Sequence, residues 1–154
     1  MKKRGQQGLT LVELIVAFTI LSILTSMAVP LARYKVRRDK ERDLSFALRT
    51  IRKAIDDYKD AALANKIQTK LGSDGYPETL QQLVEGVKLS QSADGKVVKF
   101  LRNIPIDPMT NTREWGQRST QDDPLSTSWG GQNVFDIYTK STDMARDGTL
   151  YSTW

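Results

Sequence analysis

One acidic residue inside an apolar run is the strongest chemical signal in this sequence. Glu13 lies in the stretch 9–32, where every other side chain is apolar or belongs to Ser or Thr. An ionised carboxylate in lipid is costly unless it is paired, so an acid at such a position is a functional hypothesis by default. We therefore expect Glu13 to have a cationic partner.

The residues before the apolar run suggest where that cation comes from. Residues 1–8 (MKKRGQQG) are short, basic and polar, and they end in the small residue Gly8. A secretory signal would place its cleavage site after the apolar segment, not before it. Cleavage between Gly8 and Leu9 would keep the apolar segment and create an α-amino group about one helical turn from Glu13. The amine of a neighbouring copy could then neutralise Glu13 as identical helices pack side by side.

The apolar run is long enough to cross a membrane. Stretch 9–32 comprises 24 residues, about 36 Å of helix at about 1.5 Å per residue, against a hydrocarbon core of roughly 30 Å. Beyond it, 33–64 has the apolar period of an amphipathic helix, with no Gly or Pro between Pro30 and Gly72. The apolar stripe comprises Leu44, Leu48, Ile51, Ile55, Tyr58 and Ala62. We predict one continuous helix over about 9–64, of which 9–32 is the transmembrane half and 33–64 the soluble half.

The remaining residues, 65–154, predict one small globular domain packed on the soluble half of the helix. Short apolar spacings predict a helix over 79–84, and the alternation at 134–139 predicts a strand. We expect Trp115 in or over the core. The expected loop and last edge strand are 117–133 and 150–154. The predicted fold class is α+β, with short antiparallel strands and loops beside a long N-terminal helix.

Composition excludes several classes of function. The chain has no Cys and no His, which removes disulfides, thiol chemistry and the usual general base. The net charge of +5 falls to +2 once the three cations of residues 1–8 are removed, so we expect no nucleic-acid partner. The acid pair Asp122 and Asp123 has nothing nearby in sequence to tune it for acid–base work. We predict that the protein is not an enzyme; the competing class is an enzyme or binding protein that uses the helix only as a tether.

Charge alone leaves the orientation in the membrane open. The leader carries three Lys or Arg residues, but the other flank is also basic, and the positive-inside rule counts cations on both sides. The flanking cations are Arg33, Lys35, Arg37, Arg38, Lys40 and Arg42. We interpret this charged stretch as a solvated helix face; the alternative is a contact with a neighbouring subunit or with lipid headgroups.

The junction at 8–14 (GLTLVEL) resembles the leader junction of type IV prepilins and type II secretion pseudopilins. The resemblance implies that a membrane-bound prepilin peptidase cleaves after Gly8 and methylates Leu9, although Phe or Met is commoner than Leu at that position. It also implies that Glu13 is the assembly residue and that Pro30 is the proline usual in this helix. The N-terminus is then cytoplasmic.

Three later motifs are similar to the major pseudopilin of type II secretion. These are Tyr76-Pro77 with Leu80 and Leu83, then 104–108 (IPIDP), then 135–138 (FDIY). With the N-terminus the likeness covers most of the chain, and it is weak over 112–133. The absence of Cys also favours the pseudopilin branch, because many type IV pilins carry a C-terminal disulfide.

The implied function is that of a structural subunit of a helical filament, the pseudopilus, which drives protein secretion. The implied partners are other copies of the chain, minor pseudopilins, the prepilin peptidase, the inner-membrane secretion platform and membrane lipid. The implied location is the inner membrane, crossed once, with the C-terminal domain in the periplasm. The alternative is a type IV pilin or a DNA-uptake pilus subunit.

The resemblance further implies calcium in the last loop. The expected ligands are the carboxylates of Asp143 and Asp147 and the backbone carbonyls of Lys140 and Thr142. The family's later paired Asp residues have no counterpart here, because 149–151 reads Thr-Leu-Tyr, while hard cations take six to eight oxygens. Asp122 and Asp123 are possible further donors from the neighbouring loop. The alternative is that both loop acids merely shape surface turns.

Overall fold

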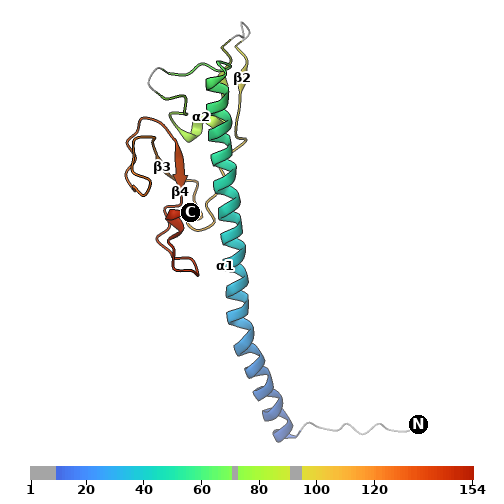
Figure 1. Ribbon diagram of the computed structural model, residues 1–154. Coiled ribbons are helices and arrows are strands. Elements are labelled where there is room, and N and C mark those ends of the chain that lie inside the picture. Colours follow the sequence, from blue (N-terminus) through green and yellow to red (C-terminus); the bar gives the residue numbers. More distant parts are fainter. Residues whose placement is uncertain (1–9, 71–72, 91–94) are drawn as a thin grey trace, which may run out of the picture. The chain divides into compact units, whose positions relative to one another are not determined.

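The structure is a computed structural model that describes residues 10–70, 73–90 and 95–154 (Figure 1). The chain divides into two compact units, unit 1 (residues 1–39) and unit 2 (residues 40–154). The helix α1 spans Leu11–Leu63, so the predicted continuous helix is confirmed to within two residues at its N-terminal end and one at its C-terminal end. The predicted leader, with Gly8 and Leu9, lies outside the described residues. The predicted bounds of the transmembrane, soluble and globular segments stay predictions.

In unit 1, α1 satisfies its own polar groups and exposes its apolar ones. The hydroxyls of Thr19, Ser22 and Thr25 donate to backbone carbonyls four residues earlier, at 2.7 to 2.8 Å, which is how helical Ser and Thr are accommodated in lipid. Pro30 lies inside the helix. Among the described residues, α1 is the one helix long and apolar enough to span a membrane by length and composition, with a mean hydropathy of 2.3 in its most apolar window.

In unit 2, the predicted apolar stripe of α1 forms one wall of the core. Leu44, Leu48, Ile51, Ile55 and Tyr58 are all buried, and Ala62 packs against them while partly exposed. Burial of this stripe removes apolar surface from water, which stabilises by roughly 25 cal/mol per Å². The amphipathic half of the helix is therefore held by tertiary packing.

Trp115 faces the same core, as the sequence predicts. Its side chain is buried, and its indole N–H donates to the Pro105 carbonyl at 3.0 Å. That bond satisfies the one polar atom of the ring, which a buried Trp requires.

The short helix α2, Leu80–Glu85, is delimited by its two end residues. Thr79 is the N-cap and accepts a hydrogen bond from the Gln82 amide, a standard N-terminal signal. Gly86 ends the helix at φ +93°, and a Cβ there would lie 2.7 Å from the Val98 carbonyl oxygen. The predicted helix over 79–84 is therefore confirmed, shifted by one residue.

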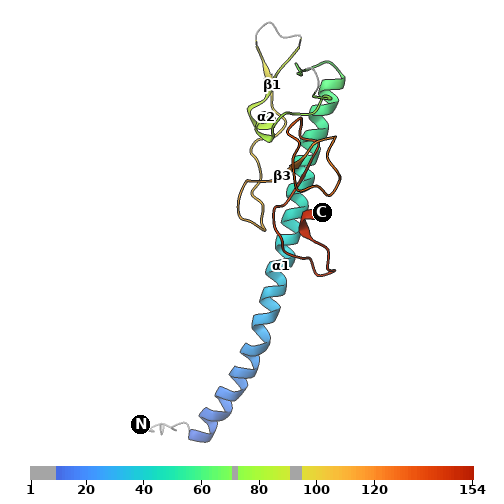
Figure 2. The same cartoon turned by 90° about the vertical axis from the view of Figure 1, so that its left-hand side faces the viewer.

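Two small antiparallel sheets complete unit 2 (Figure 2). Strand β1 (Val87–Lys88) pairs with β2 (Val97–Val98), with Val87 opposite Val98. Strand β3 (Gly116–Arg118) pairs with β4 (Asp136–Tyr138), with Gln117 opposite Ile137. The fold class is α+β. The strand predicted over 134–139 is confirmed but shorter, and the loop predicted over 117–133 is wrong at its start, which belongs to β3.

The predicted edge strand over 150–154 is also wrong. Leu150 forms an isolated bridge with Met144, and Tyr151–Thr153 is a single 3₁₀ turn, η1. In a strand, Tyr151 and Trp154 would point to opposite faces, whereas in a 3₁₀ turn residues three apart lie on one side. Their rings meet edge to face at 5.1 Å, with Tyr151 buried. The turn thus allows both aromatic rings to pack together.

Candidate functional site

Glu13 lies in the first turn of α1, close to the helix N-terminus. Its backbone N–H donates to the Thr10 hydroxyl at 3.3 Å, and its side chain is exposed. Within the part of the chain that the structure describes, no cation lies at ion-pair distance from its carboxylate. A negative charge is favourable at a helix N-terminus, but that effect is too small to offset the cost of a charge in lipid. The geometry therefore leaves the Glu13 carboxylate available to a group from another molecule.

The apolar side chains around Glu13 form an exposed surface along unit 1. Leu14, Ile15 and Phe18 are 56 to 70% exposed, and residues 10–39 are classed as exposed throughout, Met27 excepted because its side chain is not described. Monomeric soluble proteins rarely expose so large an apolar surface. Lipid or other helices must cover it.

The last loop of unit 2 is tied by its own hydrogen bonds. Asp147 accepts two bonds on Oδ1, from the Thr149 hydroxyl at 2.7 Å and the Thr149 amide at 3.0 Å. These donors stabilise the carboxylate and lower the pKa of Asp147 below its usual value of 3.8. Ala145 donates to the Thr149 carbonyl at 2.7 Å and accepts from Gly148 at 3.1 Å. The Asp147 carboxylate is thus bound to Thr149 within the loop.

The other expected calcium ligands lie around this loop. The Asp143 carbonyl accepts from the Tyr151 amide at 3.2 Å, and the Lys140 ammonium lies 3.5 Å from Glu114. Lys140 and Thr142 line a surface hollow of about 520 Å³ to which Asp143 and Asp147 do not contribute.

The donor set is short of what calcium ordinarily takes. The loop offers the carboxylates of Asp143 and Asp147, and Oδ1 of the second already accepts two bonds. Among the described residues there is no group of three or more acidic, His or Cys side chains that could hold a metal, while calcium takes six to eight oxygens. A cation would have to share Asp147 with Thr149. Calcium at these residues stays a prediction.

Asp122 binds its own loop. Its Oδ2 accepts from the backbone amides of Ser119 at 2.7 Å and Gly130 at 3.1 Å. These bonds lower the pKa of Asp122 below its usual value of 3.8. The side chain therefore organises the segment between β3 and β4.

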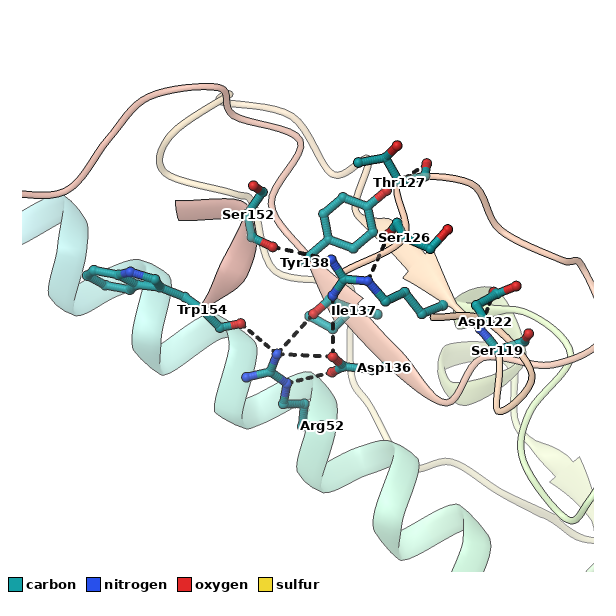
Figure 3. Close-up of polar contacts among 11 residues, drawn as sticks. Arg52, Ser119, Asp122, Ser126, Thr127, Asp136, Ile137, Tyr138, Ser152 and Trp154 are labelled. Atoms are coloured by element: carbon teal, nitrogen blue, oxygen red, sulfur yellow. Dashed lines mark hydrogen bonds and ion pairs between the residues drawn. The ribbon is translucent and has the colours of Figure 1, made fainter. Parts of the chain in front are cut away.

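A charged cluster that the sequence did not reveal joins α1 to β4 (Figure 3). Arg52 donates from Nε to Asp136 Oδ1 at 2.7 Å. Its Nη2 also donates to the Ile137 carbonyl at 3.2 Å and to the Trp154 backbone oxygen at 2.7 Å. One guanidinium thus fastens the helix to the strand and to the final turn.

A second arginine completes the cluster from the other strand of the sheet. Arg118 on β3 places Nη1 3.6 Å from Asp136 Oδ2, and its side chain is only 7% exposed. It donates from Nε to the Ser126 carbonyl at 2.9 Å, and its guanidinium carbon lies 4.1 Å from the Tyr138 ring centroid. Asp136 is a polar residue in a strand that alternates apolar and polar side chains, so the sequence predicts that it faces solvent. Nothing in the neighbouring sequence indicates its pairing with Arg52 and Arg118.

The sequence comparisons cover the predicted leader junction and extend beyond it. Residues 3–29 match the family described as the prokaryotic N-terminal methylation motif. The chain is 28% identical over 153 residues to the type II secretion system core protein G of Pseudomonas aeruginosa, covering 97% of this chain and 92% of that protein. No solved structure matches. The chain therefore carries the N-terminal methylation motif of type IV pilin-like proteins and is similar along almost its whole length to a type II secretion core protein G.

Proposed function

We propose that this chain is a structural subunit of a pseudopilus, a helical filament assembled from the inner membrane that drives protein secretion by the type II system. The observation that carries the proposal is the similarity to a type II secretion core protein G over 97% of the chain. The N-terminal motif by itself is equally compatible with a type IV pilin or DNA-uptake pilus subunit, which is the second candidate. The full-length similarity favours the pseudopilus.

The proposal also covers location and partners. The exposed apolar part of α1 would anchor the chain in the inner membrane by a single crossing, with unit 2 in the periplasm. Its partners would be other copies of itself, the minor pseudopilins, the prepilin peptidase and the inner-membrane secretion platform. No catalytic role is included, since the charged cluster of Arg52, Arg118 and Asp136 is engaged in holding helix, sheet and final turn together.

Processing tests the leader and the function together. Gly8→Ala is expected to leave residues 1–8 attached to nearly all of the protein, because a Cβ at the scissile position obstructs the approach of the peptidase to the backbone. Gly5→Ala is the matched control: it makes the same change inside the leader and should be processed normally. Mass spectrometry of the membrane fraction should find a methylated Leu9 at the N-terminus of the wild type and the control.

The same strains separate the two candidate functions. In a deletion strain, the wild-type chain and Gly5→Ala should restore secretion of proteins that otherwise accumulate in the periplasm, and Gly8→Ala should not. If wild-type protein in assembled filaments still carries Met1, the prediction that the chain is cleaved after Gly8 is wrong. If the deletion strain loses pilus retraction or DNA uptake while its secretion is unchanged, the chain is a subunit of a type IV or DNA-uptake pilus, the second candidate, and the pseudopilus proposal is wrong.

Calcium binding by the last loop is tested by thermal unfolding of the full chain. A cation that binds only the folded loop stabilises it by RT ln(1 + [L]/Kd), about 1 kcal/mol at five times Kd. We expect millimolar calcium to raise Tm by a few degrees relative to chelator, and Asp143→Ala to abolish the rise. Asp60→Ala, a change of another exposed acid, should leave it intact. Identical melting with and without calcium would mean that the Asp147–Thr149 bonds and the Tyr151–Trp154 contact close the loop unaided.

A further inference from the structure

Four cations follow the apolar part of α1 within a short stretch of unit 1. They are Arg33, Lys35, Arg37 and Arg38, all with exposed side chains. Among the described residues, no carboxylate lies at ion-pair distance from Arg33, Lys35 or Arg38. We call these four residues the basic collar. Their abundance on this flank is unexplained by topology, because the proposed orientation puts it on the side that the positive-inside rule leaves poor in cations.

The collar surrounds the helix. At about 100° per residue, Arg33 and Arg37 lie on one side of α1, and Lys35 and Arg38 lie on the opposite side. A single protein partner that docks on a helix contacts one face, so a charge pattern selected for such a partner would gather on that face. Neighbouring subunits of a filament can pack on several sides of the helix, and the filament outcome of the test below distinguishes them from lipid. Headgroups of a bilayer surround a crossing helix on all sides. The basic collar has cations on opposite sides of the helix, which fits a layer of lipid headgroups.

The depth of the collar fits as well. From Arg33 to Arg38 the helix rises by about 8 Å, which matches a headgroup layer roughly 5–8 Å thick on each side of the hydrocarbon core. Tyr34, at the same level, is 59% exposed, and Tyr is a residue typical of the membrane–water interface. The long side chains of Lys and Arg reach headgroups while their methylenes stay near the acyl chains.

We propose that the basic collar binds the phosphates of anionic phospholipid headgroups at the membrane surface from which unit 2 projects. The inference rests on the proposed function for the membrane crossing and adds a lipid preference to it. Guanidinium and ammonium groups donate charge-assisted hydrogen bonds to phosphate oxygens, and cations beside a leaflet that contains anionic lipids are attracted to those lipids.

The test compares lipid association of the full chain reconstituted in vesicles of phosphatidylcholine mixed with phosphatidylglycerol. Spin-labelled lipids of each type report the fraction immobilised on the protein. The wild type should prefer the phosphatidylglycerol label by at least about five-fold, the factor that one cation near an anionic surface contributes. High salt should weaken the preference. Joint replacement of the four collar residues by Gln should bring it close to one.

A second quadruple variant serves as the matched control, since it removes the same charge from unit 2. It replaces the exposed residues Lys66, Lys88, Lys96 and Arg113 by Gln. This variant should retain the wild-type preference. If both quadruple variants lose the preference for phosphatidylglycerol, or if neither does, the proposal that the basic collar binds anionic headgroups is wrong.

Flotation with pure phosphatidylcholine vesicles tests the crossing separately. The wild type and both quadruple variants should float with these uncharged vesicles, because the apolar part of α1 is unchanged. If the wild type does not float, both the proposed membrane crossing and the proposed lipid binding by the collar are wrong. If the wild type floats but shows no preference for phosphatidylglycerol, the membrane crossing stands and only the proposed lipid binding by the collar is wrong. A collar variant that keeps the lipid preference but no longer forms filaments would assign these cations to a subunit contact and contradict the proposal.

Discussion

A chain carrying Glu13→Val is expected to enter the membrane at least as well as the wild type and to fail in filament assembly. Insertion should not suffer, because a charge inside a membrane helix is costly, by about 2.5–3.5 kcal/mol at the helix centre and less toward the end where Glu13 lies, and Val removes it. Assembly should suffer because Glu13 is the only charged residue in 9–32. Apolar helices without a polar pair can slide past one another in many registers, and a buried polar group is a means of selecting one.

We expect filament yield and secretion to fall by at least about ten-fold, which corresponds to a loss of about 1.4 kcal/mol per subunit contact. The measurement is the amount of filament and of secreted protein in a strain whose only copy carries the change. Leu14→Val, the neighbouring apolar exchange, controls for packing and should behave as wild type. If the partner is the amine at Leu9, then Gly8→Ala should fail in the same way, since the leader removes that amine. Full secretion by Glu13→Val would reject the role.

The second large effect is expected from Asp136→Ala, which should lower the free energy of unfolding of unit 2 by about 3 kcal/mol. The change deprives two guanidinium groups of their carboxylate at once, and the Arg118 side chain is only 7% exposed. Removing one partner of a buried ion pair is far more costly than the pair is worth, because the remaining charge stays desolvated. The Arg52 side chain is 35% exposed, so water compensates part of its loss and keeps the effect at the lower end of the range for buried pairs.

Unfolding of the full chain, followed by tryptophan fluorescence, measures this effect, because Trp115, Trp129 and Trp154 all lie in unit 2. Asp57→Ala is the matched control: it also removes the acid of an ion pair, with Lys53, but both side chains are about half exposed or more. Exposed pairs of this kind contribute about 0.2–1 kcal/mol. Equal effects of the two changes would show that the cluster of Arg52, Asp136 and Arg118 adds nothing beyond an ordinary surface pair.

The sequence by itself determined the long helix, the membrane-length apolar run with Glu13, and the apolar stripe of α1 in unit 2. These features are local or periodic: an uninterrupted apolar stretch has a length, and a helix face repeats every three or four residues. The short helix α2 belongs with them, since Thr79 and Gly86 delimit it by their own backbone chemistry.

Only the tertiary structure decided how the irregular part of unit 2 is held. Arg52 and Asp136 are 84 residues apart, and their pairing depends on the register of β4 against the helix, which no local pattern contains. Asp107, which the sequence marked only as part of the 104–108 motif, is fully buried and accepts hydrogen bonds from the Met109 amide and the hydroxyls of Thr110 and Thr139. Burying such a carboxylate is tolerable only with those donors in place.

Dependence on tertiary contacts also accounts for the two wrong predictions in the C-terminal part of the chain, the loop at 117–118 and the edge strand over 150–154. Strand β3 is three residues long and polar in sequence, so neither its period nor its propensity could distinguish it from the loop that follows. Residues 150–154 have the composition of a strand, but the packing of Tyr151 against Trp154 and the Tyr151 hydroxyl bond to Glu41 at 2.7 Å favour a 3₁₀ turn. Strand propensity is weak and yields to such contacts, and the bond to Glu41 is made with a residue 110 positions away in the chain.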